Sequence, residues 1–479
     1  MATATIEKRE FPMFIGGEWV RTNTPHTVRL PYDGTPVGEI FEGDASTAER
    51  AVTAAHAGAA AMAALTQYER AELLERMRRL LERDAAEFTL LVCYESGKPI
   101  REARAEVDRC QQTLIASADA ARNLRGEVIP MEAAPIGKGR WGMTVREPLG
   151  VIGAITPFNV PLNLALHKIG PAFAAGNSVV HKPSGNTPLS ALRLARLIEE
   201  AGAPRGAYNI ITGPGSKLGP PLITDARVAM ITFTGSVPVG EEIRAQMGLR
   251  RVTLELGSNS SVILEPDFDI DALLPRIVVG SFTHSGQVCI SVQNIYVHES
   301  IEKAFTERFV AATQKLKIGH PLDETTDISS LISLGEAERV EQWINHARSR
   351  GAQVITGGKR QNTTIEPTIL TNVAADLEVC CREVFGPVVV IHSYRKLPEA
   401  INAVNASDYG LQAGICTRDL ATAFEAARQL HVGGVIVNDV PTFRADHMPY
   451  GGVKKSGIGR EGPHFTVEEM TELKLICWR

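Results

Sequence analysis

The stretch GVIGAITPFNVPLNLALHKIGPAFAAGNSVVHKPS, residues 150–184, decides the fold of this chain. A short β-rich run, VIGAI, is followed by an apolar segment of helical length and then by a second β-rich run, SVVHK. The alternation continues with the runs YNIITG, VAMITFTG and VTLELG, which are separated by helical segments. Strands that alternate with helices predict a parallel sheet with helices on both faces. Residues 145–256 therefore indicate an α/β, Rossmann-type domain that binds a dinucleotide.

The chain on either side of this stretch is also regular. The first residues read as short strands followed by amphipathic helices. Two S/T-x-x-E capping boxes, Ser46 with Glu49 and Thr66 with Glu69, are expected to start two of these helices. After residue 257 a second α/β set follows, including a helix expected over 270–282 and the strand-like run CISVQNIYVH. At 479 residues the chain exceeds the size at which one hydrophobic core stops growing, so two or three domains are expected.

Composition narrows the class of partner. Hydrophobic residues make up 44% of the chain and charged residues 22%, with a formal net charge of -5. These values give no electrostatic reason to expect nucleic acid or an anionic membrane as a partner. The chain has no run of 18 apolar residues, and its first residues place no uninterrupted apolar core behind a basic end, so neither export nor membrane insertion is expected. The seven cysteines include no C-x-x-C pair and no Cys/His cluster at metal-binding spacing. We therefore expect reduced thiols, a cytoplasmic protein and no bound metal.

One cysteine stands out by its position. The segment SFTHSGQVCI, residues 281–290, places Cys289 after a glycine turn that follows an apolar, helix-like run. A thiol at its ordinary pKa of about 8.5 is only a few per cent thiolate at neutral pH, yet sulfur is a strong nucleophile that needs little activation. Cys289 is therefore a candidate nucleophile, and the alternative is a small buried apolar residue.

Three strand-to-helix turns of the predicted sheet suit a dinucleotide. Residues 213–219, GPGSKLG, are glycine-rich but one residue longer than the usual fingerprint. Residues 233–236, FTGS, combine a glycine that permits close backbone approach with Ser236, which is expected to cap the next helix. Residues 181–184, HKPS, end a strand with the cation Lys182 and a hydroxyl. Open α/β sheets bind ligands at these strand ends, so the turns together favour a dinucleotide site; the alternative is ordinary turn glycines and a surface lysine.

Seven motifs give the chain a strong resemblance to the aldehyde dehydrogenase superfamily. They span most of the chain, in the family's order and at about its spacings. The resemblance implies an α/β, aldehyde dehydrogenase-like fold with a Rossmann-type cofactor domain and a second α/β domain. The motifs are TPFNVP at 156–161, KPS at 182–184, FTGS at 233–236, LELGSNS at 254–260, FTHSGQVC at 282–289, EVFGPV at 383–388 and PYGGVKKSGIGRE at 449–461.

The resemblance also divides the chain into three parts. We expect a dinucleotide-binding domain from residues 1–124 and 145–256, a catalytic domain from 257–462, and a small β element that bridges subunits from 125–144 and 463–479. The resemblance implies that this element forms a homodimer or a homotetramer, and a terminal strand without a partner would otherwise be an open sheet edge.

Each matching residue has an implied role. Cys289 is the expected nucleophile, which forms a thiohemiacetal with the aldehyde and, after hydride transfer to the nicotinamide, a thioester. Asn159 is expected to stabilise the oxyanion together with the Cys289 backbone N–H, and Glu255 to act as the general base for the hydrolytic water. Glu383 and Phe385 are expected to position the nicotinamide ribose and ring. The remaining expected cofactor contacts are Ile155, Thr156, Pro157, Lys182, Ser184, Gly185, Gly215, Gly219, Phe233, Gly235, Ser236 and Leu256.

The choice of cofactor depends on a departure from the family pattern. Many NAD-preferring members carry a glutamate three residues after the lysine, where this chain has Gly185. No carboxylate at that position repels a 2'-phosphate, and Lys182 and Ser184 are placed to contact one. We expect NAD or NADP, with NAD ahead because no added arginine is evident beside the site.

The substrate is expected from the subgroup that these motifs resemble, which oxidises small hydroxylated or anionic aldehydes such as lactaldehyde, glyceraldehyde, sulfolactaldehyde and phosphonoacetaldehyde. An anionic tail needs a cation near the thiol, and Arg109, Arg444 and His447 are candidates, with Phe158 in the pocket wall where many members have tryptophan. Each candidate cation also fits an ordinary surface or intersegment ion pair. Alternatives are a broad or aromatic aldehyde dehydrogenase, a CoA-acylating semialdehyde dehydrogenase and a non-catalytic relative.

Overall fold

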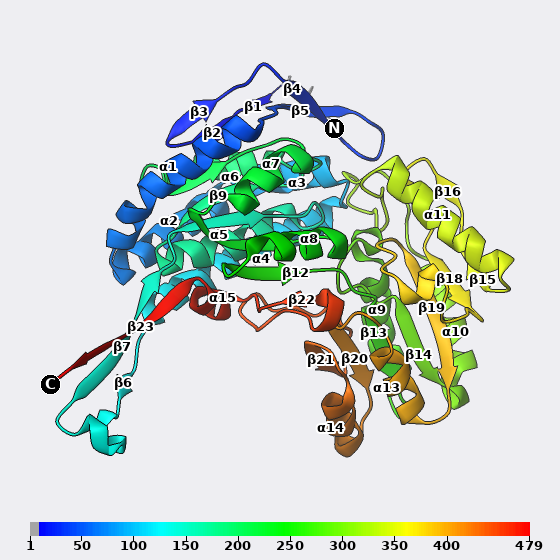
Figure 1. The fold of residues 1–479 in the computed structure, drawn as a ribbon. Helices are drawn as coiled ribbons and strands as arrows, with labels where there is room; N and C mark the ends of the chain where they lie inside the picture. The colour runs from blue at the N-terminus through cyan, green and yellow to red at the C-terminus, as the bar shows by residue number, and fades with distance from the viewer. Residues whose placement is uncertain (1–8) are drawn as a thin grey trace.

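Two large sheets organise the molecule, one of eight strands and one of seven, and a narrow three-stranded arm projects from the first (Figure 1). The computed structural model describes residues 9–479. Within these residues no helix has the length and apolar character needed to cross a membrane. No group of three His, Cys, Asp or Glu side chains in the same residues is placed to hold a metal ion.

The strands predicted between residues 145 and 256 form the middle of the eight-stranded sheet. Its order is β22-β12-β11-β8-β9-β10-β2-β3, and the five strands from β12 to β10 run parallel. The first of these five strands in the sequence, β8, lies in the centre; β9 and β10 then extend the sheet to one side, and β11 and β12 extend it to the other. The prediction of a parallel α/β sheet is therefore confirmed. The parallel strands are β8 (Val151–Ile155), β9 (Ser178–Lys182), β10 (Tyr208–Ile210), β11 (Val228–Thr234) and β12 (Arg251–Glu255), and the antiparallel outer strands are β2 (Met13–Ile15), β3 (Glu18–Val20) and β22 (Gly457–Ile458).

Helices cover both faces of this sheet, and each face has its own hydrophobic core. One core joins the sheet to the helices α2 to α6, and the other joins it to α1, α7 and α8. The helix α5 is buried along its whole length between the sheet and α4. The bounds are α1 (Ala45–Ala64), α2 (Gln67–Arg83), α3 (Ala85–Ser96), α4 (Ile100–Asn123), α5 (Pro161–Ala175), α6 (Leu189–Glu200), α7 (Gly215–Thr224) and α8 (Val237–Met247).

Of the two predicted capping boxes, one is confirmed and one is wrong. Thr66 caps α2, because its hydroxyl accepts from the Glu69 N–H at 3.2 Å and the Glu69 carboxylate accepts from the Thr66 N–H at 2.8 Å. Ser46 does not start α1, since that helix begins after Asp44, whose carboxylate accepts from the Thr47 N–H at 3.1 Å. An aspartate two residues earlier takes the capping position and leaves Ser46 inside the first turn.

The second large sheet has the order β15-β18-β19-β14-β13-β20-β21. The predicted helix over 270–282 is α9 (Ile270–Phe282), but the strand expected from residue 289 begins only at Asn294, so Cys289 lies in a loop. The strands are β13 (Ser261–Leu264), β14 (Asn294–His298), β15 (Gln353–Thr356), β18 (Thr368–Thr371), β19 (Val388–Tyr394), β20 (Gln412–Cys416) and β21 (Gly434–Val437), and the later helices are α10 (Glu299–Thr313), α11 (Leu334–Ser349), α12 (Glu378–Cys381), α13 (Leu397–Asn405), α14 (Leu420–Gln429) and α15 (Pro463–Glu469).

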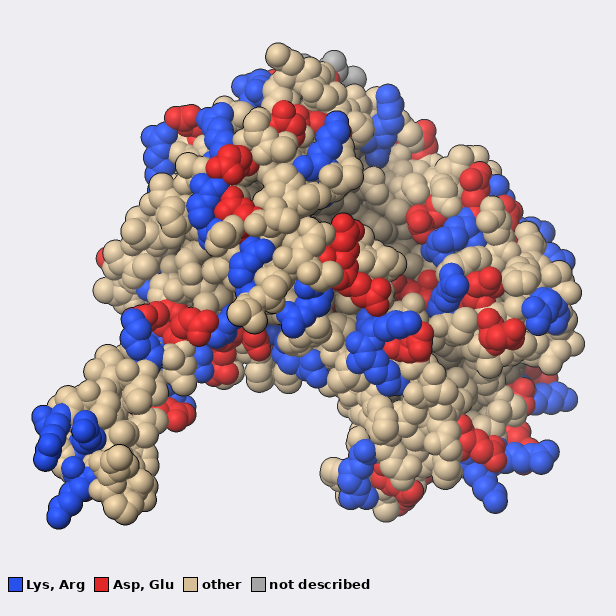
Figure 2. All heavy atoms as spheres, viewed as in Figure 1, with Lys and Arg blue, Asp and Glu red and all other residues tan. Residues whose placement is uncertain are grey.

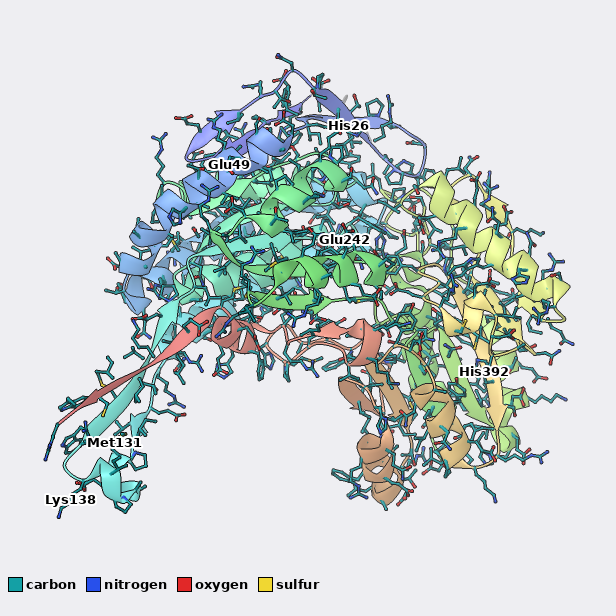
Figure 3. The ribbon with its side chains drawn as sticks, in the orientation of Figure 1. His26, Glu49, Met131, Lys138, Glu242 and His392 are labelled. Carbon is teal, nitrogen blue, oxygen red and sulfur yellow. The ribbon has the colours of Figure 1, made fainter. Side chains whose placement is uncertain are left out.

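The arm is a small antiparallel sheet made from the C-terminal strand and a hairpin. The strand β23 (Thr471–Trp478) pairs along its whole length with β7 (Trp141–Pro148), which also pairs with β6 (Val128–Ile129). The labelled side chains of Met131 and Lys138 lie near its far end, away from both large sheets (Figure 3). Charges of both signs are mixed over the body, whereas basic side chains gather near the end of the arm (Figure 2). A further small sheet at the N-terminal side consists of β1 (Glu10–Phe11), β5 (Pro36–Phe41) and β4 (Pro25–Arg29).

Candidate active site

Cys289 lies in the loop between helix α9 and strand β14. After α9 the chain turns tightly at Thr283–Gly286, where φ is 47° at His284 and 73° at Gly286. Gly286 approaches another loop so closely that an added Cβ would lie 2.1 Å from the carbonyl oxygen of Gly386, which only glycine permits. The predicted glycine turn is therefore present, and the Cys289 side chain after it is partly exposed.

Asn159 reaches the same loop from the end of strand β8. Its side-chain N–H donates a hydrogen bond of 2.9 Å to the backbone carbonyl of Gln287, two residues before Cys289. Asn159 is only 4% exposed, so this contact is made inside the protein. The fold thus brings the predicted amide next to the loop of the predicted nucleophile.

Glu255 ends strand β12 and is 3% exposed. Neither of its carboxylate oxygens has a hydrogen-bond partner within the residues that the structure describes. The absence of a side chain at Gly451 leaves room for the Glu255 carboxylate, since a Cβ added to Gly451 would lie 2.9 Å from Glu255 Oε1. Burial, and after it the negative charge of Glu461, raise the pKa of Glu255 well above its usual range. A negative charge on Glu255 in turn raises the pKa of Cys289, so the two groups lie within electrostatic reach of each other.

Two residues of the 444–450 segment approach the thiol. The Oη of Tyr450 lies 2.9 Å from the Sγ of Cys289, and the guanidinium carbon of Arg444 lies 3.7 Å from the centre of the Tyr450 ring. Burial raises the pKa of Cys289 to about 11, while the Tyr450 hydrogen bond and the positive charge of Arg444 act in the opposite direction. Arg444 was expected near the thiol, but Tyr450 was missed, since nothing in the PYGG motif alone indicates a contact with a cysteine 161 residues earlier.

The charge of Arg444 belongs to a buried group of three side chains. Its Nη2 lies 3.0 Å from Glu461 Oε2, and Lys168 Nζ lies 2.7 Å from Glu461 Oε1. Burial opposes the charge of Glu461, but the two cations outweigh it and hold the pKa of this carboxyl below its usual range. Two cations therefore share one carboxylate, and one of them, Arg444, lies over the Tyr450 ring, so the group carries an excess of positive charge.

The other predicted substrate residues lie in different settings. Arg109 donates two hydrogen bonds to Asp446, at 2.8 and 3.2 Å. It therefore forms an ion pair between two segments, which is the alternative to a role in substrate binding, and 39% of its side chain stays exposed. His447 follows Asp446 and is exposed. Phe158 packs edge to face against Phe385 with ring centres 5.6 Å apart, so the predicted pocket wall touches a predicted cofactor residue.

The predicted cofactor residues lie at the carboxyl ends of the parallel strands. Lys182 reaches the start of α7, because an added Cβ on Gly215 would lie 3.7 Å from its Nζ. Ser236 occupies the N-cap position of α8, as its motif predicts, but its hydroxyl makes no capping hydrogen bond to the helix. Ile155 ends β8 and Thr156 and Pro157 follow it, Ser184 and Gly185 follow β9, Gly215 opens α7 and Gly219 lies within it, Phe233 lies in β11 with Gly235 and Ser236 after it, and Leu256 follows β12.

These strand ends fit a dinucleotide. The helices α7 and α8 begin without a side-chain cap, which leaves backbone N–H groups to bind phosphate oxygens. The Lys182 ammonium donates to the Pro183 carbonyl at 3.1 Å, and burial lowers its pKa to about 8. A Cβ added to Gly185 would meet nothing within 4 Å, so there is open space beside the end of β9. The donors, the cation and the open space suit the phosphates and ribose of NAD(P).

Glu383 and Phe385 lie beside the loop of the thiol. A small cavity is lined by both of them together with Ser258 and Val288, the residue before Cys289. The Ser258 backbone N–H donates to the Glu383 carboxylate at 2.9 Å, and burial raises the pKa of Glu383 to about 7. Phe385 has a φ of 49°, which is uncommon for a bulky residue. The fold therefore places the predicted nicotinamide contacts next to the predicted nucleophile.

Comparison with known proteins gives the class of this protein. The aldehyde dehydrogenase family model matches residues 19–476. The chain is 48% identical over 474 residues to 3-sulfolactaldehyde dehydrogenase from Priestia aryabhattai, covering 99% of each chain. Its structure is similar to that of aldehyde dehydrogenase 21 from Physcomitrella patens in complex with the reaction product succinate, with a TM-score of 0.96, 37% identity and 98% of each chain covered. It is also similar to glyceraldehyde-3-phosphate dehydrogenase GapN from Methanocaldococcus jannaschii complexed with NADP, with a TM-score of 0.92, 39% identity and coverage of 95% of this chain and 100% of that one.

The chain belongs to the aldehyde dehydrogenase family. It is an oxidoreductase that acts on aldehydes, and its family uses NAD(P). The resemblance and the fold class expected from the sequence are both confirmed.

Proposed function

We propose that this enzyme oxidises an aldehyde to its carboxylic acid in two stages on Cys289. The Cys289 sulfur attacks the aldehyde carbon, and the Asn159 side chain and the Cys289 backbone N–H stabilise the oxyanion that forms. NAD(P), when bound, accepts the hydride from this carbon. Glu255 then deprotonates the water that hydrolyses the remaining thioester. The observation that supports this proposal is that the Asn159 amide donates a hydrogen bond to the loop of the thiol, while the charge of the buried Glu255 carboxylate acts on the same thiol.

Glu255 favours water over CoA as the group that resolves the thioester. Its carboxylate is buried, lies within electrostatic reach of Cys289 and has no protein partner within residues 9–479, so it is available to bind a water molecule. The variant Cys289→Ala is expected to abolish aldehyde-dependent NAD(P)H formation. The variant Glu255→Gln is expected to form about one equivalent of NAD(P)H per active site and then to stall, as measured by stopped-flow absorbance. This single turnover should be slower than in the unmodified enzyme, because the variant also lacks the base that takes the proton of the thiol. Turnover that requires CoA in the unmodified enzyme would instead support the acylating alternative.

The proposed substrate is a small aldehyde that carries a hydroxyl or an anionic group. Arg444 supports this, because its guanidinium stacks on the ring whose hydroxyl contacts the thiol and because it shares one carboxylate with Lys168. A relative of 48% identity is named for 3-sulfolactaldehyde. A broad or aromatic aldehyde dehydrogenase is the second candidate, which the edge-to-face pair of Phe158 and Phe385 favours. A panel of aromatic, aliphatic, hydroxylated and anionic aldehydes separates the two by kcat/KM.

The finer properties of the cofactor and the assembly are also part of the proposal. We place NAD ahead of NADP, and the same panel run with each cofactor tests this order. The arm supports a homodimer or homotetramer, because it projects from the body and exposes Val128, Trp141 and Leu473 to 75%, 64% and 56%. We also propose the division into cofactor, catalytic and bridging parts, which the two large sheets and the arm support, with β22 of the proposed catalytic part joining the first sheet and β7 running across residue 145. The free state of the seven cysteines supports a reducing, cytoplasmic location.

A further inference from the structure

The hydroxyl of Tyr450 meets the sulfur of Cys289. The two atoms lie 2.9 Å apart, and Tyr450 is only 2% exposed. Within residues 9–479 the sulfur is the hydrogen-bond partner of this hydroxyl. A buried phenol usually finds a partner, and here that partner is the atom that reacts with the aldehyde in the proposed function.

The position of the Tyr450 ring is fixed from three sides. Its backbone exchanges two hydrogen bonds with Glu461, at 3.0 and 2.6 Å. The ring packs in a small apolar cluster with Ile290 and Leu411, while the Arg444 guanidinium lies over its face. Because the ring is held in this way, the hydroxyl has little freedom to turn away from Cys289.

We propose that Tyr450 is a further catalytic residue, whose hydroxyl donates a hydrogen bond to the Cys289 thiolate and holds the sulfur in place for attack. This inference rests on the proposed function, in which Cys289 is the nucleophile. The S–H proton passes to the base, Glu255, and Tyr450 keeps its own proton. A sulfur electron pair then forms the C–S bond, and the carbonyl π pair moves to the oxygen. The hydrogen bond therefore acts before and during attack and is weakened once the sulfur is neutral.

The charges around Tyr450 and Cys289 agree with a hydrogen bond in which the Tyr450 hydroxyl donates and the Cys289 thiolate accepts. Burial, the Cys289 thiolate and Glu255 raise the pKa of Tyr450 well above its usual range, although Arg444 acts against them. The phenol is therefore protonated at neutral pH and is the donor when the sulfur is charged. At the sulfur, Arg444 helps Tyr450 to stabilise the thiolate, while Glu383 and Glu255 oppose it. When the pKa of a thiol falls by about one unit, the fraction of thiolate rises about tenfold, while the nucleophilicity of each thiolate falls only about threefold. The lower pKa therefore increases the overall rate of attack.

The test is the pH dependence of thiol alkylation in Tyr450→Phe. This change removes the hydroxyl and keeps the ring under Arg444. Full-length enzyme is treated with iodoacetamide from pH 7 to 11, and the peptide that contains Cys289 is quantified by mass spectrometry. We expect the apparent pKa of Cys289 to rise by about one to two units, since a hydrogen bond to a charged group is of that strength. Its alkylation at pH 8 should slow about 4-fold to 16-fold, because the greater nucleophilicity of the less acidic thiol offsets part of the loss of thiolate. An unshifted profile would overturn the proposal.

Two controls separate the effect from a general loss of structure. The exposed Cys381, which lies outside the proposed bridging element, serves as an internal reference in every sample, because its rate should not change. Tyr68→Phe is the matched variant, since Tyr68 is 69% exposed on α2 and should leave the Cys289 profile unaltered. In aldehyde oxidation, Tyr450→Phe is expected to lower kcat with little change in the KM for NAD(P), which a merely structural role would not produce selectively.

A second substitution covers the case in which the phenylalanine variant does not fold. Replacement of Tyr450 by 3-fluorotyrosine makes the hydroxyl a stronger donor and nearly preserves its size. The apparent pKa of Cys289 should then fall, and a rise or no change contradicts the proposal. Failure of the proposed function is a separate outcome, because it appears as retained turnover in Cys289→Ala, whereas the alkylation profile reports on the thiol itself.

Discussion

The carboxylate of Glu106 accepts a hydrogen bond of 2.9 Å from the backbone N–H of Leu162. Glu106 lies on α4, and its other oxygen pairs with the Lys98 ammonium in an ion pair whose side chains are only 3% and 5% exposed. One turn earlier on the same helix, Glu102 accepts from the backbone N–H of His284 at 2.7 Å. Two carboxylates of α4 thus hold the start of α5 and the turn that leads to the thiol loop.

The change Glu106→Gln should destabilise the protein by about 3 kcal/mol, because it removes the carboxylate that pairs with the buried Lys98 ammonium. The segment that begins at Asn159 should also lose its fixed position, so kcat should fall with the stability. Urea unfolding of the variant measures the first effect and steady-state kinetics the second. Glu324→Gln is the matched control, since Glu324 pairs with Arg104 on the surface and should cost about 1 kcal/mol or less. Equal losses of unfolding free energy in the two variants would show that the buried Glu106–Lys98 pair contributes no more to stability than the exposed Glu324–Arg104 pair.

The change Asn159→Ala should lower kcat by about 100-fold to 1,000-fold, as removal of one oxyanion donor does elsewhere. The KM for NAD(P) should change little, because the cofactor strand ends stay intact. Single-turnover measurement of NAD(P)H formation tests this at the first chemical stage. Asn123→Ala, at the exposed end of α4, is the control and should keep full activity. A variant that loses only substrate affinity would remove Asn159 from the proposed mechanism.

The value of kcat should rise with pH between about 7 and 10. Burial and the charge of Glu461 raise the pKa of Glu255, and burial raises the pKa of Cys289 to about 11. Both groups act in their deprotonated forms in the proposed mechanism, so the active fraction grows as protons are lost. The KM for NAD(P) should rise above pH 8, because Lys182, whose pKa burial lowers to about 8, then loses its charge. Profiles of kcat and KM at saturating aldehyde check both trends, and a flat kcat profile speaks against them.

The change Gly185→Glu should shift the cofactor preference towards NAD. A Cβ at this position would meet nothing within 4 Å, so the new side chain has room. Its carboxylate repels a 2'-phosphate and can accept hydrogen bonds from ribose hydroxyls. We expect kcat/KM with NADP to fall about tenfold or more and that with NAD to be retained or improved. Gly185→Gln, of the same size and without charge, is the control; an equal loss with both cofactors in the glutamate variant would show only crowding.

The change Arg444→Gln should affect anionic aldehydes more than neutral ones. The guanidinium lies beside the ring of Tyr450, and the lost charge-assisted contact corresponds to a factor of about 10 to 100 in kcat/KM. With neutral aldehydes of similar size, any decrease in kcat/KM comes from the effect of Arg444 on the thiol alone. The ratio of the decreases for anionic and neutral aldehydes therefore measures the contribution of the substrate charge. If both classes decline equally, Arg444 acts on Cys289 and Glu461 and not on the substrate.

Much of the fold follows from local pattern. The alternation of β-rich and helical runs between residues 145 and 256 predicted the parallel strands, since a helical or extended period is visible within a few residues. The start of α2 followed from Thr66 and Glu69. The start of α1 did not, because Asp44 competes with Ser46 for the same capping position. Ser236 takes the N-cap position of α8 but makes no capping hydrogen bond, since the residue type alone does not fix the direction of its side chain.

By itself, the sequence determined the class of protein, the parallel sheet and the three segments that supply the proposed thiol, amide and base. Only the tertiary structure decided that Tyr450 touches Cys289, that Arg444 stacks on Tyr450, and that Arg109 pairs with Asp446. The physical reason is that a motif reflects the backbone and chemistry of a few neighbouring residues. Contacts between distant side chains, such as Tyr450 with Cys289 and Arg109 with Asp446, depend on how the two large sheets and their loops pack, and the Arg444–Tyr450 contact depends on the path of an irregular loop. No local period of the sequence contains that information.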